Sequence, residues 1–333
     1  MLLAPLPLDA HPRVIVDWLE LSVICSEFNQ TQISDLQRIW DTHRNTEDTD
    51  FEGNSQDTED SFRESIDEEI RIRMEALDEA YPFDYSETGE EFFLKEQLTS
   101  GAIAYLYCLF MSHPDKDEVI SGEIVPKIDN SVRDLFQICS TIAAAGEVSG
   151  SAVSFGHPRE DQSGFLTKLR ETYALFGEGA VREQTLPGVT RSPKDDGMDV
   201  IAWSHSNDNA PGKYYLLGQV ASGRNWHGKS ILGIIDKFHE NWFEVRPVST
   251  PNPSIFIPFH IPSIADETLE ERMRSLTLEF GKVFYRLRIP LLINEGIESA
   301  NIQNRHVERV AEFNKIATWV SQTRAEFRTR PAH

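Results

Sequence analysis

Two oxygen-bearing side chains in the second half of the chain interrupt apolar runs where both can reach one ligand. Asp199 opens the run DVIAW in the segment DGMDVIAW, and Gln219 follows 20 residues later in the run YYLLGQVA. If the two runs are neighbouring strands, both side chains can bind one divalent cation, because Mg²⁺ prefers hard oxygen ligands. A bound Mg²⁺ or Mn²⁺ can activate water and stabilise the charge that develops on a phosphate. We therefore expect a metal-dependent site at Asp199 and Gln219.

The pattern D-G-x-D before one apolar strand, with a second apolar strand ending in Q-x-K, resembles the PD-(D/E)XK nuclease superfamily. It is most similar to the Mrr-like restriction endonucleases, and the matching stretch covers residues 160–240. The resemblance implies that Asp199 binds the metal, that Gln219 occupies the second polar position and that the carbonyl of Val220 is a further ligand. It also implies a restriction-endonuclease-like α/β fold and Mg²⁺- or Mn²⁺-dependent hydrolysis of DNA in restriction or antiviral defence.

The sequence departs from the family pattern at the lysine, because Ala221 stands two residues after Gln219. An alanine cannot polarise water, so another cation must serve if the site is active. Lys213 lies six residues before Gln219, about 20 Å away on a strand. Arg224 and Lys229, just past the strand, are the better candidates.

A second departure concerns the helix before the aspartate strand, where the family often has a glutamate. The corresponding stretch here begins QSGFL, and only Asp161 or Glu171 offers a carboxylate nearby.

Three functional hypotheses remain open on these residues. The first is a metal-dependent nuclease acting on DNA, and the second is a catalytically degenerate nuclease fold that serves as a DNA- or partner-binding subunit. The third is an acidic protein-interaction module. D-G-x-D is also a common turn, and Gln219 can simply cap a strand, so the motif by itself does not separate the three.

The charge of the chain is divided unevenly. Residues 1–150 contain 32 acidic and 10 basic side chains, whereas residues 151–333 contain 22 of each, and the whole chain has a formal net charge of −22. The acidic half is expected to contact a protein partner. The balanced charge of the second half does not exclude the binding of a polyanion such as nucleic acid.

Other classes of protein are disfavoured by the absence of their signatures. The three cysteines are far apart and lack metal-binding spacing, which argues against a disulfide framework or a zinc site. No targeting leader or membrane-spanning run is expected, so a cytoplasmic location fits best. The phosphate-loop, dinucleotide-binding and G-x-S-x-G motifs do not occur.

Hydrophobic spacing predicts two domains. Residues 1–150 are expected to form an acidic, mostly helical domain with a mobile insert at 41–69, and residues 151–333 an α/β domain. Helices are expected within 13–40 and over 70–81, 98–111, 130–145, 162–177, 267–287 and 302–327. Strands are expected over 199–203, 214–221, 254–261 and 290–293.

Overall fold

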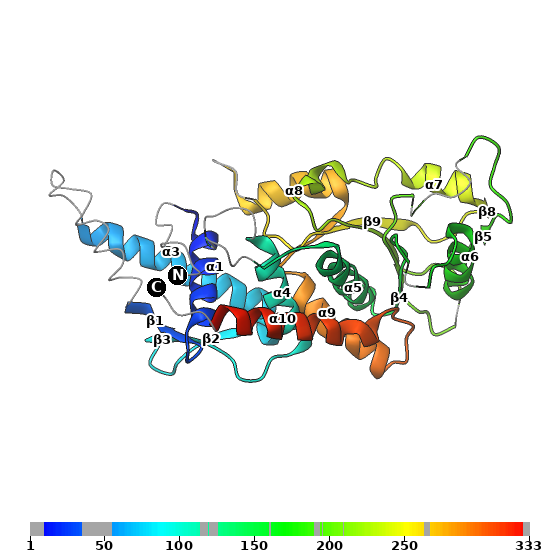
Figure 1. Cartoon of the computed structure of the whole chain (residues 1–333). Helices are drawn as coiled ribbons and strands as arrows, with labels where there is room; N and C mark the ends of the chain where they lie inside the picture. Colours follow the sequence, from blue (N-terminus) through cyan, green and yellow to red (C-terminus); the bar gives the residue numbers. More distant parts are fainter. Residues whose placement is uncertain are drawn as a thin grey trace. The chain divides into compact units, whose positions relative to one another are not determined.

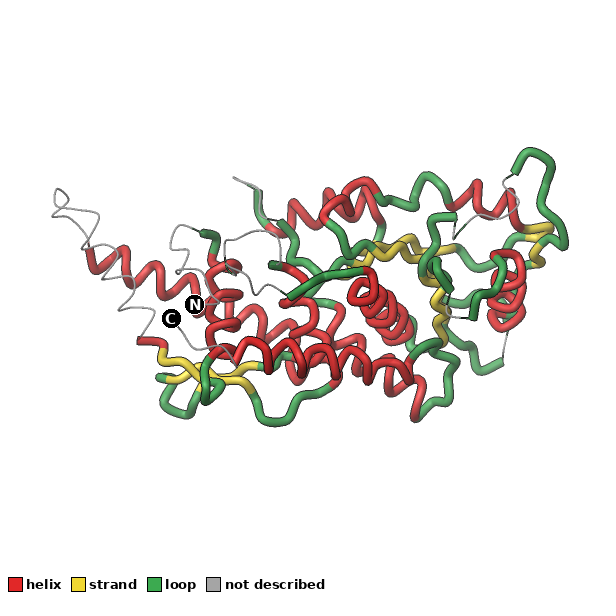
Figure 2. The backbone as a smooth tube through the Cα atoms, viewed as in Figure 1, coloured by secondary structure: helices red, strands yellow, loops and turns green. Residues whose placement is uncertain are grey.

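The computed structural model describes residues 10–34, 55–113, 119, 126–159, 161–189, 194, 196–208, 210–262 and 267–328 (Figures 1 and 2). The chain divides into two compact units. The first comprises Met1–Ile128 with Ile316–His333, and the second comprises Asp129–Lys315. The fold is mixed α/β, with a more helical N-terminal part and a five-stranded sheet in the C-terminal half.

The first unit combines helices with a small antiparallel sheet. Its helices are α1 (Pro12–Cys25), α3 (Ser55–Leu77), the short η1 (Asp78–Ala80) and α4 (Ser100–Ser112), and its strands are β1 (Gln30–Gln32), β2 (Phe83–Tyr85) and β3 (Glu91–Leu94), in the order β1-β3-β2. The apolar run that forms α4 is buried along most of its length. The aromatic ring of Trp319, from α10 (Phe313–Arg328), packs edge-on against Tyr107 of α4.

A buried network of charged groups connects α1 with α3. Arg73 is fully buried and donates hydrogen bonds to Asp17, Glu20 and Glu69 at 2.8–3.0 Å. The hydroxyl of Tyr105 also donates to Glu20. A buried charge needs such partners because leaving water costs several kcal/mol per ion.

Part of the expected insert at 41–69 is helical. Residues 41–54 lie outside the described part of the chain, but residues 55–69 form the first turns of α3, so a loop is wrong for that portion. Ile66 and Ile70 are buried and lie one helical turn apart, which gives this acidic helix an apolar edge to pack.

The sheet of the second unit has the order β10-β9-β7-β6-β4. Its strands are β4 (Ser151–Ser154), β6 (Val200–Trp203), β7 (Tyr215–Val220), β9 (Pro251–Phe256) and β10 (Lys282–Phe284). Strands β4, β6 and β7 are successively antiparallel, whereas β7, β9 and β10 run parallel. The N-terminal end of β6 therefore lies beside the C-terminal ends of the other four strands, β4, β7, β9 and β10.

Helices cover both faces of this sheet. Helix α5 (Asn130–Glu147) lies on β4, β6 and β7, with α9 (Ile289–Asn301) packed against it (Figure 1). Two glycines allow the close crossing: a Cβ at Gly146 would lie 2.1 Å from the carbonyl oxygen of Leu292, and one at Gly296 would lie 2.0 Å from that of Ile142. A short two-stranded sheet is formed by β5 (Ala180–Val181) and β8 (Phe243–Val245).

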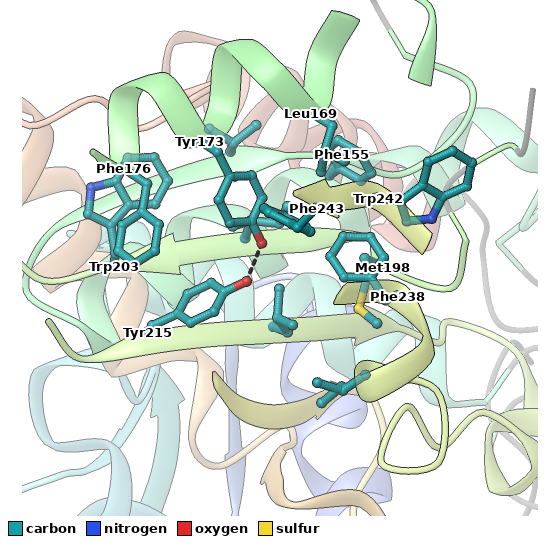
Figure 3. Packing of buried hydrophobic residues seen from close by; sticks show 14 of the residues in the cluster. Phe155, Leu169, Tyr173, Phe176, Met198, Trp203, Tyr215, Phe238, Trp242 and Phe243 are labelled. Atoms are coloured by element: carbon teal, nitrogen blue, oxygen red, sulfur yellow. Dashed lines mark hydrogen bonds between the residues drawn. The ribbon is translucent and has the colours of Figure 1, made fainter. Parts of the chain in front are cut away.

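The opposite face carries the aromatic core of the unit (Figure 3). Tyr173 and Phe176 of α6 (Phe165–Phe176) pack on Tyr215 of the sheet, and Phe176 also packs on Trp203. Trp242 of α7 (Ile235–Trp242) packs on Phe165 of α6. The hydroxyls of Tyr173 and Tyr215 share a buried hydrogen bond, drawn in Figure 3.

Two elements differ from their predicted type. Only part of the helix expected over 267–287 forms, as α8 (Leu269–Phe280), because the chain turns at Gly281 with φ 77° and continues as β10. A Cβ at Gly281 would lie 2.1 Å from the carbonyl oxygen of Pro253. The strand expected at 290–293 lies inside α9, whose proline stands in the first turn, where its missing N–H has no helical partner to lose.

Two predicted ranges are also divided differently. Of the helix expected over 302–327, α10 begins only at Phe313, and the short η3 (Val310–Glu312) precedes it. The expected boundary at 150 differs from the compact units: α5 groups with the sheet that it covers, and residues 316–333 group with the first unit.

Candidate functional site

Asp199 and Gln219 lie directly opposite each other on neighbouring antiparallel strands. Val200 pairs with Gly218, and extending this register by one residue places Asp199 opposite Gln219. The backbone N–H of Asp199 donates to the carbonyl of Gly218 at 2.8 Å. Because side chains alternate along a strand, residues paired in this way project from the same face.

The two side chains touch. The amide Nε2 of Gln219 donates a hydrogen bond to Oδ2 of Asp199, and the backbone N–H of Val220 donates to the same oxygen at 2.8 Å. Asp199 is 8% exposed, so these donors stabilise a carboxylate that is largely withdrawn from water. The contact of Val220 described here uses its N–H, and coordination through its carbonyl stays a prediction.

A third polar side chain, Gln137 of α5, reaches the same place and was not singled out from the sequence. Its Nε2 donates to the backbone carbonyl of Asp199 at 2.7 Å and to Oγ of Ser154 at 3.3 Å. A carbonyl can only accept, so the contact fixes which end of the amide carries the nitrogen. The available signal was a lone glutamine between Phe136 and Ile138, in a helix whose buried residues are mostly apolar.

Two acceptor oxygens converge over Gly156. A Cβ at this glycine would lie 2.9 Å from Oδ1 of Asp199 and 3.1 Å from Oε1 of Gln137. Any larger residue would therefore crowd both oxygens, so a glycine is needed for them to lie this close to the backbone at residue 156. A carboxylate oxygen next to an amide oxygen is the type of donor pair that Mg²⁺ or Mn²⁺ binds.

The turn before β6 presents Asp199 to this space. Asp196 and Gly197 have φ values of 53° and 84°, so the D-G-x-D segment contains a left-handed turn and also opens a strand. Oδ2 of Asp196 accepts a 2.6 Å hydrogen bond from the indole of Trp242, which ties the turn to α7. Asp196 is thus held by the core, whereas Asp199 faces Gln219.

Of the two carboxylates considered in place of the family glutamate, Asp161 is paired with a lysine and Glu171 is exposed. Oδ2 of Asp161 lies 3.1 Å from the ammonium of Lys168, which also binds Glu308. Burial opposes ionisation of Asp161, but hydrogen bonds from Ser163 and Lys168 lower the pKa of its carboxyl to about 2. Glu171 is exposed on α6. The helix residue at the Asp199 site is Gln137 instead.

Lys168 is connected with the polar network around the site through Glu308. The carboxylate of Glu308 accepts a hydrogen bond from the backbone N–H of Ser154 at 2.8 Å. The hydroxyl of Ser154 in turn accepts a hydrogen bond from the amide of Gln137. Burial opposes protonation of Lys168, but Glu308 and then Asp161 raise the pKa of its ammonium group. This buried cation therefore remains charged, and three hydrogen bonds through Glu308 and Ser154 connect it with Gln137.

The cations considered from the sequence occupy different places. The ammonium of Lys213 binds the carbonyl of Phe176 and lies 5.2 Å from the centre of its ring, so it caps the C-terminus of α6. Arg224 is exposed at the start of the short helix η2 (Arg224–Gly228), and Lys229 follows it. Ala221 is fully buried, and its N–H donates to Phe256.

The donor set fits a divalent cation, although its charge is low. Within the described ranges, no group of three or more His, Cys, Asp or Glu side chains is placed to hold a metal ion. Asp199 would supply the anionic oxygen and Gln137 a neutral amide oxygen. The amide of Gln219 presents its N–H to Asp199, so its predicted role as an oxygen ligand to the metal stays a prediction. A site with one carboxylate should bind Mg²⁺ or Mn²⁺ weakly and leave much of the ion's shell to water.

Comparison of the chain with protein-family models, with curated proteins and with solved structures finds no match. Among the described residues, no helix is both long and apolar enough to cross a membrane.

Proposed function

We propose that the second unit is a nuclease-like domain that acts on nucleic acid, most specifically DNA, with the help of Mg²⁺ or Mn²⁺. The observation that carries this proposal is the convergence of Oδ1 of Asp199 and Oε1 of Gln137 over Gly156, with Gln219 on the other carboxylate oxygen. The mixed sheet supports it, since β6, which follows Asp199, is paired with β7, which contains Gln219. Restriction or antiviral defence is the proposed setting.

Each residue of the site would have a separate role in binding the metal ion or the phosphate. Asp199 would be the anionic ligand, with Gln137 orienting its backbone and offering an amide oxygen beside Oδ1. Gln219 and Val220 would hold Oδ2 and so fix the direction in which Oδ1 points. When bound, the metal ion would supply a more acidic water and positive charge beside a phosphate. Arg224 and Lys229 would attract the phosphate backbone from η2.

A second candidate function is binding without cleavage, as a DNA- or partner-binding subunit. It is favoured by Ala221, which is buried and cannot act as a base or polarise water. It is also favoured by the low charge of the site, where the described part of the chain contributes one carboxylate. Acidic protein contacts through the first half of the chain are compatible with either candidate.

The experiment measures cleavage of duplex and single-stranded DNA by the purified full chain in Mg²⁺, Mn²⁺ or EDTA. We expect metal-dependent cleavage that falls at least about 100-fold in Asp199→Asn, because the one anionic ligand among the described residues of the site is lost. We expect a fall of about tenfold or more in Gln137→Ala and smaller losses in Arg224→Ala and Lys229→Ala. Asp208→Asn, which removes an exposed carboxylate of the same unit, is the control.

The outcomes separate the candidates. Equal cleavage by the wild type and Asp199→Asn contradicts a nuclease site at Asp199. DNA binding that survives EDTA, with no cleavage in any metal, supports the second candidate.

A further inference from the structure

The segment after β7 carries an exposed aromatic ring on a rigid support. The imidazole of His227 stacks on the indole of Trp226, with ring centroids 3.7 Å apart and planes 30° apart. His227 is exposed, whereas Trp226 is only 3% exposed. One face of the imidazole is therefore backed by a buried indole.

The support is anchored from several sides. Trp226 packs on Phe280 of α8 at a centroid distance of 5.4 Å, and its carbonyl accepts the N–H of Lys229 at 3.0 Å. The hydroxyl of Ser230 donates to the carbonyl of Glu279, also in α8. These contacts hold His227 in place, so a ligand that stacks on it would find the ring already ordered.

The surface around His227 is open and carries positive charge. Arg224, Asn225 and Gly228 are exposed, and a Cβ added at Gly228 would meet nothing within 4 Å. Arg224 and Lys229 flank the ring in sequence. The helix η2 begins five residues after Gln219, so the Cα of Arg224 lies within ~17 Å of that of Gln219 even for a fully extended chain.

We propose that His227, stacked on Trp226, is a platform for an unpaired base of single-stranded nucleic acid, with Arg224 and Lys229 binding the adjacent phosphates. Aromatic rings stack on any base and cations track the backbone, a combination typical of single-strand binding. The inference rests on the proposed function, because it assigns the strand form that the Asp199 site receives.

The test measures binding in EDTA, so that it is independent of cleavage. Fluorescence anisotropy compares an oligothymidine with an oligonucleotide of the same length made of abasic residues. We expect the wild type to bind the oligothymidine at least about fivefold more tightly, since the abasic strand keeps the phosphates and lacks the bases. His227→Ala should lose most of this preference, and His227→Phe should keep it.

Two further comparisons separate stacking from charge. Arg224→Ala and Lys229→Ala should each lower the slope of log affinity against log salt by about 0.7, whereas His227→Ala should leave the slope unchanged. His306→Ala, which removes another exposed imidazole of the same unit, should bind like the wild type.

The proposal is overturned if the wild type binds both oligonucleotides equally, which needs no variant to fold. It is also overturned if His227→Ala retains the full preference, or if a duplex binds more tightly than a single strand of equal length. Loss of cleavage in Asp199→Asn with an intact preference for bases supports the platform separately from the metal site.

Discussion

Within the described residues, one carboxylate with two neighbouring amides defines the chemistry available at residue level. Oδ2 of Asp199 accepts hydrogen bonds from the amide of Gln219 and the backbone N–H of Val220. Its Oδ1 lies beside the amide oxygen of Gln137 over Gly156. Replacing amides with acids changes the charge of such a site without much change in shape. The charge, more than the geometry, should therefore limit metal affinity.

Gln219→Glu should increase metal affinity and make stability depend on metal. Two adjacent carboxylates repel each other when both are ionised, and a divalent cation relieves the repulsion. Near pH 8 in EDTA, we expect Gln219→Glu to have a lower melting temperature than the wild type. Millimolar Mn²⁺ should raise the melting temperature of the variant more than that of the wild type. Asn207→Glu, which adds the same charge at an exposed turn, should show neither effect. An equal response of the two variants to Mn²⁺ would argue against metal binding at Asp199.

His239 should make stability fall in mild acid. The residue is 5% exposed, and its ring contacts Phe238 and Phe243. Its Nε2 has no hydrogen-bond partner in the part of the chain that the structure describes. Burial first, and then the charge of Arg246, lower the pKa of its imidazole from 6.5 to about 4, with Asp236 opposing. Between these pH values the unfolded chain binds a proton that the folded chain does not, so stability is lost as pH falls.

The contribution of His239 is measured by comparing the wild type with His239→Leu. We expect the free energy of unfolding of the wild type to fall by ~2 kcal/mol more than that of His239→Leu between pH 7 and pH 4. Denaturant titration at each pH provides the values. Parallel pH profiles for the two proteins would mean that His239 titrates normally in the folded state.

Close helix packing is the main feature at the scale of elements. Helix α5 is held between the sheet and α9, and it is also the element that delivers Gln137 to Asp199. Its position therefore links packing with the candidate site. The glycines at the crossing make the approach possible because a carbonyl occupies the space that a Cβ would need.

Gly146→Ala should destabilise the second unit by separating α5 from α9. The added methyl group would meet the carbonyl oxygen of Leu292 at 2.1 Å, which rigid backbones cannot accommodate. We expect a loss of about 1–3 kcal/mol, measured by denaturant unfolding. Gly164→Ala is the matched control, because its Cβ would meet nothing within 4 Å and its φ of −69° suits alanine. Equal stability of both variants would show that the helices can move apart without cost.

Charge is distributed unequally at the scale of the whole molecule. The formal charge of −22 arises within residues 1–150, and residues 151–333 are balanced. In the first unit, the buried cation Arg73 pairs with three carboxylates, but many acids of α3 lie on its exposed face. Those exposed acids repel each other through water and salt screens them.

Raising the salt concentration should therefore stabilise the protein. We expect the melting temperature to increase by a few degrees between about 20 mM and about 300 mM NaCl, because the Debye length falls below the spacing of surface charges. Sodium chloride is suited to this test because it screens charge with little preferential exclusion. A melting temperature that decreases with salt would indicate that favourable ion pairs outweigh the repulsion among the acids.

Much of the architecture could be predicted from local sequence. Alternating and helical apolar patterns identified α4, α5, α6, β6 and β7, because each buries a face that must be apolar. The segment DGMD and the run ending at Gln219 also predicted that the two side chains lie on neighbouring strands, which the hydrogen bond between them confirms. Such features depend on residues close together in the chain.

Other features depend on contacts that no local pattern contains. The turn at Gly281 and the helical state of Pro290 follow from packing against Pro253 and from the position of proline in a first turn. Gln137 joins the site from a helix 62 residues before Asp199, because the sheet register and the α5 packing bring it there. The sequence by itself therefore determined strands β6 and β7 and the candidate aspartate. Only the tertiary structure decided which distant oxygen lies beside it.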